Sequence, residues 1–203
     1  MRKNYQLITD EEIKKIELNG IRPKLLLHSC CGPCSSYVLE YLSKYFDITV
    51  LFYNPNIYPE SEYSKRLEEQ FKLIEKADFE GNIEVMQAGY DYGKFLKAVN
   101  GLEEEREGGK RCFECFKLRL FETAKTAKEY GFDYFASTLT VSPHKNADIL
   151  NNIGLELERE FNIKYLVSDF KKKDGYKRSI ELSKRFGLYR QNYCGCEFSV
   201  WFD

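Results

Sequence analysis

The sequence has only two histidines, which excludes a metal site built mainly from imidazole ligands. It also lacks long hydrophobic runs, since its densest aliphatic stretch is Leu25-Leu26-Leu27, which is far too short to span a bilayer. No apolar segment follows a basic start, so the pattern of a secretory signal is missing as well. From these absences we expect a cytoplasmic protein with no membrane partner. Structural disulfides are disfavoured in that reducing compartment.

The chain has almost no net charge, because 31 basic residues nearly cancel 32 acidic ones. Internal repeats, low-complexity tracts and a clear linker are absent, and 203 residues suit one compact core. We therefore predict a single α/β domain over residues 1–203. Within it we expect an N-terminal extension (1–22), a mobile loop rich in glutamate and glycine (100–111) and an irregular C-terminal tail (188–203) that contributes cysteines to a metal site.

Short apolar runs alternate along the chain with segments whose apolar residues recur at helical spacing. This alternation predicts an α/β fold with a mostly parallel sheet flanked by helices, which binds its ligands beyond the carboxyl ends of the strands. The predicted strands are 24–28, 48–53, 83–87, 133–137 and 164–167, and the predicted helices are 33–45, 60–77, 113–130 and 146–161.

What the sequence does have is seven cysteines in three tight groups: Cys30, Cys31 and Cys34, then Cys112 and Cys115, then Cys194 and Cys196. Thiols at such short spacings either bind metal or cycle through a disulfide. Four thiolates saturate a tetrahedral zinc or a cubane cluster, so three cysteines are left for a second iron or a redox pair.

The first group follows a predicted strand and opens a predicted helix, where Pro33 suits the first turn. Thiolates at a helix N-terminus are stabilised by the dipole and by free N–H groups, which favours metal binding or nucleophilic use. The tetrapeptide from Cys31 to Cys34 also allows an alternative, a thioredoxin-like dithiol oxidoreductase. Thioredoxins usually have tryptophan before this pair, where the chain has Cys30, and they do not need four further clustered cysteines.

The second and third cysteine groups do not identify the metal. Cys112 and Cys115 lie one turn apart at a predicted helix start, a common half-site for zinc or an iron–sulfur cluster. Gly195 lets Cys194 and Cys196 face one centre or close a strained disulfide. A zinc-stabilised RNA-binding module is therefore a second alternative. An ATP-dependent tRNA modifier ranks last, because the chain has neither a Ser-Gly-Gly-x-Asp-Ser motif nor a Walker loop.

Residues 159–190 contain ten basic and four acidic residues, so this segment could bind a polyanion. From charge alone a solvated helix face is the simpler explanation. Aromatic residues among the cations favour RNA, because exposed bases are bound by stacking combined with phosphate pairing. The cations that we assign to substrate binding are Lys171, Lys172, Lys173, Lys177 and Arg178.

Two further segments follow predicted strands. Ser142 and Lys145 lie where a strand gives way to a helix, so free N–H groups and the lysine could hold a phosphate or a modified base. Helix capping by Ser142 is the alternative. Tyr53, Asn54 and Asn56 could read base edges, although an ordinary turn explains them as well.

Six segments in this order are typical of one enzyme family: residues 28–37, 52–57, 108–115, 138–146, 168–173 and 189–196. In these segments the chain resembles the epoxyqueuosine reductases of the QueH type, and the resemblance covers most of its length. It implies a fold similar to the HUP group of nucleotide-binding α/β domains. It also implies removal of the epoxide oxygen from epoxyqueuosine at the tRNA wobble position, the last step of queuosine biosynthesis.

The resemblance implies a [4Fe–4S] cluster beside a mononuclear iron. Carried over residue by residue, it assigns Cys30, Cys31, Cys112 and Cys115 to the cluster, and Cys34, Cys194 and Cys196 to the iron. Some relatives have aspartate where Cys34 stands, and both carboxylate and thiolate can hold ferrous iron. In a rival assignment Cys194 and Cys196 form a redox-active disulfide that passes electrons inward. The implied partners are tRNA carrying epoxyqueuosine and an external low-potential electron donor.

Opening an epoxide to an alkene with loss of water consumes two electrons and two protons. An iron with an open coordination position could polarise the epoxide oxygen, and Cys194 and Cys196 would take part as iron ligands or as the redox pair. We consider four residues as proton donors and favour Asp169 over His144, Tyr193 and His28. For His28, packing at the end of its strand is the simpler role.

Overall fold

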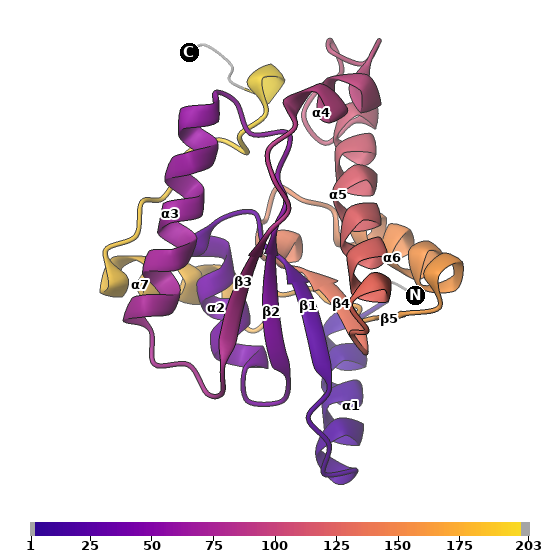
Figure 1. The fold of residues 1–203 in the computed structure, drawn as a ribbon, viewed down its shortest axis with the longest axis vertical. Coiled ribbons are helices and arrows are strands. Elements are labelled where there is room, and N and C mark those ends of the chain that lie inside the picture. Colours follow the sequence, from indigo (N-terminus) through magenta and orange to yellow (C-terminus); the bar gives the residue numbers. More distant parts are fainter. Residues whose placement is uncertain (1–2, 200–203) are drawn as a thin grey trace.

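Five parallel strands form the centre of the fold in the computed structural model, which describes residues 3–199 (Figure 1). Their order across the sheet is β3-β2-β1-β4-β5. The strands are β1 Lys24–His28, β2 Asp47–Phe52, β3 Ile83–Gln87, β4 Tyr134–Ser137 and β5 Lys164–Tyr165. The helices are α1 Tyr5–Leu18, α2 Gly32–Leu42, α3 Glu60–Lys76, α4 Tyr92–Val99, α5 Lys110–Glu129, α6 Ala147–Phe161 and α7 Gly175–Phe186, with short 3-10 turns η1 Thr138–Val141 and η2 Glu197–Ser199.

Helices cover both faces of the sheet, with α2, α3 and α7 on one side and α5 and α6 on the other (Figure 1). Side chains of a strand alternate between the two faces. In β1, Leu25 and Leu27 pack in the core with α2, α3 and α7, whereas Leu26 packs in the core with α5 and α6. Burial on both faces explains why the strands are continuous apolar runs in the sequence.

The predicted α/β fold with a parallel sheet is confirmed, and the element boundaries differ from the prediction by up to three residues. Strand β5 ends at Tyr165 because the backbone N–H and C=O of Ser168 both bond the Asn151 side chain, at 2.9 Å each. Helix α5 begins at Lys110, inside the segment expected to be a loop. Residues 1–2 of the predicted extension and 200–203 of the predicted tail, with Trp201 and Phe202, lie outside the described residues.

Helices α1, α4 and α7 were not among the predicted helices, although a solvated helix face was considered for the positive segment that contains α7. Helix α1 lies in the expected N-terminal extension, and its buried apolar residues, Tyr5, Ile13 and Ile16, are too sparse among charged residues to form a clear pattern. Helix α4 spans only about two turns between Tyr92 and Val99. Among residues 3–199, no helix combines the length and apolar character needed to cross a bilayer.

Strand β1 lies between β2 and β4, so the connections after β1 and β4 leave the sheet toward opposite sides. In open parallel sheets such a point, at the carboxyl ends of the strands, is where ligands bind. Residues 29–34 follow β1 and residues 138–146 follow β4. The first cysteine group therefore lies at the position in the sheet that this topology favours for a ligand.

Candidate active site

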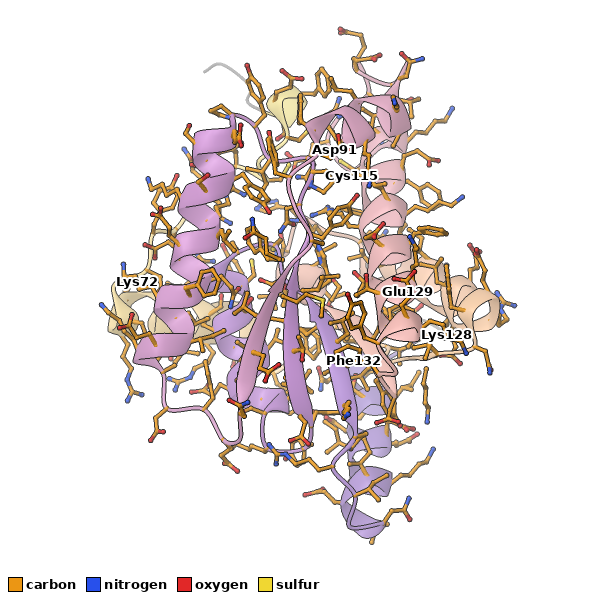
Figure 2. The ribbon with its side chains drawn as sticks, in the orientation of Figure 1. Lys72, Asp91, Cys115, Lys128, Glu129 and Phe132 are labelled. Atoms are coloured by element: carbon orange, nitrogen blue, oxygen red, sulfur yellow. The ribbon has the colours of Figure 1, made fainter. Side chains whose placement is uncertain are left out.

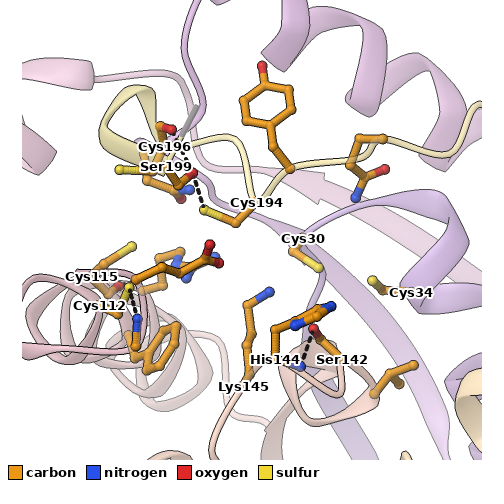
Figure 3. A pocket seen from close by; sticks show the side chains of 18 of the residues that line it. Cys30, Cys34, Cys112, Cys115, Ser142, His144, Lys145, Cys194, Cys196 and Ser199 are labelled. Carbon is orange, nitrogen blue, oxygen red and sulfur yellow. Dashed lines mark hydrogen bonds between the residues drawn. The ribbon is translucent and has the colours of Figure 1, made fainter. Parts of the chain in front are cut away.

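Six of the seven cysteines line one cavity of about 400 Å³ at the carboxyl edge of the sheet (Figure 3). They are Cys30, Cys34, Cys112, Cys115, Cys194 and Cys196. Figure 2 shows Cys115 near the end of α5 that reaches this edge, whereas Lys128 and Glu129 lie at the opposite end of the helix. Cys31 is fully buried behind Cys30. Thiols from three distant segments thus meet at one site.

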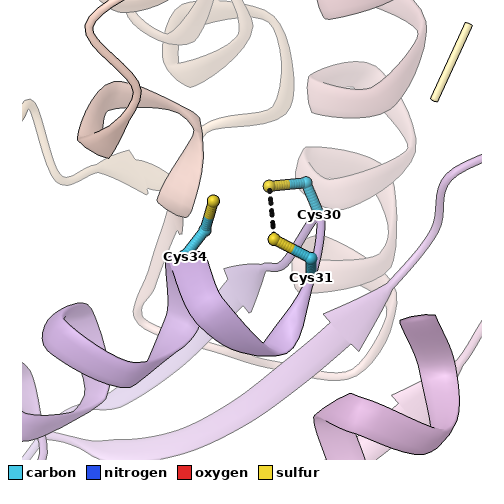
Figure 4. Close-up of side chains that lie close together, drawn as sticks. All are labelled: Cys30, Cys31 and Cys34. Carbon is cyan, nitrogen blue, oxygen red and sulfur yellow. Dashed lines mark hydrogen bonds between the residues drawn. The ribbon is translucent and has the colours of Figure 1, made fainter. Parts of the chain in front are cut away.

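The first cysteine group forms a compact triad at the start of α2 (Figure 4). The Sγ atoms of Cys30, Cys31 and Cys34 lie within 4.8 Å of one another, and those of Cys30 and Cys31 are 3.8 Å apart. No other trio of histidine, cysteine or acidic side chains within residues 3–199 brings its ligand atoms so close. The triad is therefore the best-formed metal-binding group in the described structure.

Local backbone geometry sets the triad. Cys31 is the extended residue that precedes α2, and Pro33 lies in the first turn, as predicted. Gly32 lies against α3, where a Cβ atom would approach the Glu69 carbonyl oxygen to 2.6 Å. Only glycine allows this approach, which brings the cysteine loop against α3.

Hydrogen bonds among the three thiols separate their pKa values. Bonds from Cys31 and Cys34 lower the pKa of Cys30 well below its ordinary range, although burial acts in the opposite direction. The interaction with Cys30 raises the pKa of Cys34 and raises that of Cys31 to about 12. The Gln191 amide also donates to the Cys31 Sγ at 2.9 Å. Within the triad the hydrogen bonds therefore favour the thiolate form of Cys30 over those of Cys31 and Cys34.

Cys112 and Cys115 lie in the first turns of α5, and their charge state differs from that of Cys30. The Gly108 backbone N–H donates to the Cys112 Sγ at 3.2 Å. Burial raises the pKa of Cys112, and it raises that of Cys115 to about 11. Both groups are therefore neutral thiols at pH 7 unless a metal ion displaces the proton.

The third group lies in the irregular segment before η2. Gly195 has φ +105°, so the chain turns sharply between the two cysteines. A hydrogen bond from Cys196 lowers the pKa of Cys194, and the same bond raises the pKa of Cys196. The Ser199 hydroxyl lies 3.0 Å from the Cys194 Sγ. Both cysteines are free thiols in the structure.

Two cations face these sulfur atoms, and neither has a carboxylate partner within residues 3–199. Lys145 points into the space between Cys30 and Cys194 (Figure 3). Burial alone would lower the pKa of Lys145, but the electrostatic interaction with nearby cysteines, chiefly Cys30 and Cys194, raises it. Arg119 is 3% exposed and donates its Nε–H to the Cys115 carbonyl at 3.2 Å. Since a buried cation needs a counter-charge, the pocket is suited to an anionic group.

Three of the predicted substrate-binding residues, Asn56, Ser142 and Lys145, line the cavity, and so does His144. Asn56 is 2% exposed, and its Oδ1 has no partner in the described part of the chain. The Ser142 hydroxyl accepts the His144 backbone N–H at 3.3 Å within the turn. The helix capping considered for Ser142 is wrong, because Asn146 caps α6.

Tyr193, one of the considered proton donors, also lines the cavity. The other predicted substrate-binding residues and Asp169 lie outside it. Tyr53 and Asn54 are buried beneath it, and Asn54 donates to the Ser29 carbonyl at 2.8 Å. Asp169 forms an ion pair with Lys171 at 2.6 Å, and both line a neighbouring cleft with Lys172. That cleft shares His144 and Lys145 with the cysteine pocket. Farther along, Lys173 binds Asp10 and Arg178 binds Glu40, while Lys177 is exposed.

His28 has the structural role considered for it. Its Nδ1 lies 2.9 Å from the Ser137 hydroxyl and its Nε2 lies 3.1 Å from the Tyr53 carbonyl. Because the carbonyl can only accept, Nε2 carries the proton and Nδ1 accepts from Ser137. Complete burial lowers the pKa of His28 to about 3, so the ring is neutral and fully hydrogen-bonded at pH 7.

Several pocket residues were not predicted as site residues from the sequence: Arg66, Glu107, Arg111, Arg119 and Gln191. Arg119 had a usable signal, because it follows Cys115 by four residues and so lies on the same helix face. The sequence contains no comparable signal for Arg66, since it lies in the middle of α3, far along the chain from every cysteine.

Comparisons with known proteins agree with the sequence motifs. The family model described as "Epoxyqueuosine reductase QueH" matches residues 25–201. A curated Streptococcus pyogenes protein with that name is 46% identical over 199 residues, which cover 97% of this chain and 78% of the relative. The Staphylococcus epidermidis protein of the same name is 46% identical over 203 residues, with coverages of 97% and 84%. The Thermotoga maritima protein of that name is 37% identical over 179 residues, with coverages of 87% and 90%.

Among solved structures, the chain resembles the U34-tRNA thiolase NcsA from Methanococcus maripaludis, determined with its [4Fe-4S] cluster. The TM-score is 0.50 at 13% identity, and the match covers 96% of this chain and 69% of the thiolase. At this identity the likeness concerns the fold alone.

Proposed function

The chain belongs to the epoxyqueuosine reductase QueH family, and on this premise we propose that the cysteine pocket is where it removes the epoxide oxygen of epoxyqueuosine in tRNA. It is an oxidoreductase of the final step of queuosine biosynthesis. The observation that carries the proposal is the convergence of cysteines from three distant segments on one cavity. Such a site can hold the redox centre that a two-electron reduction requires.

The donor set fits an iron–sulfur centre. Cys30 and Cys31 have Sγ atoms 3.8 Å apart, which is the spacing of two thiolates on one tetrahedral ion, so both are positioned to bind metal. A cubane cluster takes one thiolate per iron, so these two sulfur atoms would have to move apart to hold one. Cys112, Cys115, Cys194 and Cys196 supply further thiols across the same cavity. When bound, the centre would supply electrons one at a time, and an iron with an open position would polarise an oxygen atom.

We propose that the ligands divide as the family resemblance implies, with Cys30, Cys31, Cys112 and Cys115 on a [4Fe–4S] cluster and Cys34, Cys194 and Cys196 on a single iron. In the structure Cys34 groups with Cys30 and Cys31 instead of with Cys194 and Cys196. A rotation about the Cα–Cβ bond of Cys34 would redirect its sulfur. Iron counts of single-cysteine variants decide between the two groupings.

Protein residues around the cavity have separate roles in this proposal. The Lys145 ammonium group lies where it can stabilise negative charge on the departing oxygen. The unpartnered Asn56 Oδ1 can accept a hydrogen bond from a substrate hydroxyl or base N–H. Of the considered proton donors, His144 and Tyr193 line the cavity, while Asp169 lines the neighbouring cleft.

The neighbouring cleft is suited to the tRNA backbone. Lys3, Lys171 and Lys172 line it, together with the loop that carries Lys145. Since phosphates are bound mainly by lysine and arginine, we propose that nucleotides flanking the modified base cross this cleft. An external low-potential donor, for which dithionite can stand in, would supply the electrons.

The proposal is tested with protein purified and reconstituted anaerobically with iron and sulfide. About four to five irons per chain, the visible absorption of an iron–sulfur centre and loss of one oxygen atom from epoxyqueuosine in tRNA support it. A colourless, zinc-loaded protein that binds tRNA without turnover would overturn it in favour of the RNA-binding module. Nucleoside mass spectrometry gives the readout.

The Cys112→Ala variant separates the remaining alternative. A dithiol oxidoreductase acting through Cys31 and Cys34 would keep its activity, whereas the cluster proposal requires iron and activity to be lost together. Complete burial of Cys31 already disfavours a dithiol that must meet an external disulfide.

A further inference from the structure

The segment that carries Cys194 and Cys196 has little regular structure to hold it in place. Between α7 and η2 the chain forms neither helix nor strand, and we call residues 193–198 the cysteine tail. One backbone bond anchors its centre, from the Tyr58 N–H to the Gly195 carbonyl at 2.8 Å. Figure 3 shows the two cysteines with Ser199 at one wall of the pocket. Something beyond this single bond must keep their sulfur atoms facing the other thiols.

Arg66 holds the beginning of the tail. It projects from α3, is 1% exposed, and has its Nε fixed by the Glu62 carboxylate at 2.7 Å. Its two Nη groups donate to the carbonyls of Cys194 at 3.0 Å and Tyr193 at 3.4 Å. The guanidinium also lies 5.0 Å from the centre of the Tyr193 ring.

Arg111 holds the end of the tail. It directly precedes Cys112 in α5 and is 1% exposed. One Nη donates to the carbonyls of Glu103 and Glu105, and the other donates to the Phe198 carbonyl at 3.1 Å. Arg111 therefore links the helix that carries the second cysteine pair to the segment that carries the third.

Burying two guanidinium groups costs free energy, which indicates that their contacts stabilise one particular arrangement of the tail. A buried arginine is costly unless most of its donors are satisfied, and here backbone carbonyls of the tail accept from both arginines. Among residues 3–199 the Arg111 Nε has no partner. The planar fork of arginine suits two carbonyls at fixed spacing, which a lysine does not reproduce. Gly195 packs tightly against Arg66, since a Cβ there would lie 3.0 Å from Nη1.

From this geometry we infer that Arg66 and Arg111 are positioning residues that hold Cys194 and Cys196 toward the thiols of α5 and the triad. They act through the backbone of the cysteine tail, and neither needs to touch the substrate. These roles apply to the metal-free protein, so their test does not depend on the iron–sulfur proposal.

The test measures the alkylation rate of each cysteine in the reduced, metal-free, full-length protein by mass spectrometry. In Arg66→Met and Arg111→Met, loss of a charged hydrogen bond should speed alkylation of Cys194 and Cys196 by about tenfold or more, while the triad cysteines stay within about twofold. The lysine variants of both positions should give intermediate alkylation rates, because an ammonium group keeps the charge but makes only part of the guanidinium contacts with the backbone carbonyls.

Arg22, which is exposed, provides a control at the opposite edge of the sheet. It also donates to backbone carbonyls, those of Ser43 and Lys44, and pairs with Asp47. Arg22→Met should leave the ratio of tail to triad alkylation unchanged. Equal acceleration of all seven cysteines in the Arg66 or Arg111 variants, or unchanged rates at Cys194 and Cys196, would overturn the inference. Should a methionine variant not fold, the lysine variants decide by the same ratio.

Discussion

Two groups of cations in this molecule differ in their partners. On the side of α7, Arg178 makes a two-point contact with Glu40 at 2.7 and 2.9 Å, and Lys173 binds Asp10 at 2.7 Å. In the cysteine pocket, Lys145 and Arg119 have no carboxylate partner among residues 3–199 and face sulfur atoms instead. The positive segment 159–190 was the conspicuous one in the sequence, yet the cations free to meet an anion include two that lie outside it.

The difference has an energetic meaning. Exposed ion pairs such as Arg178 with Glu40 contribute about 0–1 kcal/mol and leave little charge available to a ligand. A buried cation without a partner destabilises the protein by itself and gains most when an anionic centre or substrate arrives. The pocket cations should therefore affect function strongly and the paired cations should affect it weakly.

Lys145→Met should have the largest effect. Its ammonium group points into the space between Cys30 and Cys194, so its loss should lower the single-turnover rate on epoxyqueuosine tRNA by about 100- to 1,000-fold. The iron content should stay that of the unmodified protein. A parallel loss of iron would instead make Lys145 a counter-ion of the centre, and metal analysis of the same sample separates the two results.

Arg119→Met should have the next largest effect. It should not lower the thermal stability of the metal-free protein, but it should weaken metal binding. Without metal, removal of a buried unpaired charge should leave the thermal midpoint equal or higher. With metal, loss of the positive charge beside Cys115 should weaken Co²⁺ binding by about 10- to 100-fold, followed by thiolate absorption. Arg119→Lys retains the charge and serves as the matched control. A metal-free protein that becomes less stable, with unchanged Co²⁺ affinity, would contradict the expected role.

Lys172→Ala and Arg178→Ala compare an unpaired with a paired cation on the tRNA side. Lys172 is exposed in the cleft beside the pocket, so its removal should weaken tRNA binding severalfold and reduce the salt slope by about one. Arg178→Ala should change the affinity less, since Glu40 and Glu181 already neutralise the guanidinium. Filter binding across a salt series measures both. A larger loss for Arg178 would show that the carboxylate pairs release it to RNA.

The sequence predicted the sheet and the cysteine cluster well because both depend on local patterns. Continuous apolar runs such as Leu25-Leu26-Leu27 are typical of strands buried on both faces, and closely spaced thiols are typical of metal sites. The carboxyl-edge position of the first group then followed from the rules for parallel sheets.

The pairing of charges could not be read from the sequence, because it depends on which residues face each other after folding. Lys173 and Asp10 are separated by 163 positions along the chain, and Arg66 and Cys194 by 128. Asn54 was expected to contact substrate, yet its turn folds inward and the side chain bonds Ser29. The predicted end of β5 was wrong because the Asn151 side chain takes the place of a backbone hydrogen bond between neighbouring strands.

Asp10→Asn should have the smallest effect and tests the paired side of the comparison. Burial acts to raise the pKa of Asp10, but hydrogen bonds from Lys173, Tyr41 and Gln6 lower it overall. A depressed folded pKa means that the carboxylate stabilises the protein above its unfolded pKa of about 3.9, and that this stability is lost as the pH falls through the lower folded value.

At pH 7 the asparagine variant should be less stable by about 0.2–1 kcal/mol in urea unfolding, because the pair with Lys173 is largely exposed. The difference should shrink as the pH falls below about 4 and as salt rises. This sign is opposite to that expected for Arg119→Met without metal, since Asp10 neutralises a cation and Arg119 lacks such a partner. If both substitutions destabilised the metal-free protein alike, pairing would not be what distinguishes the two groups of cations.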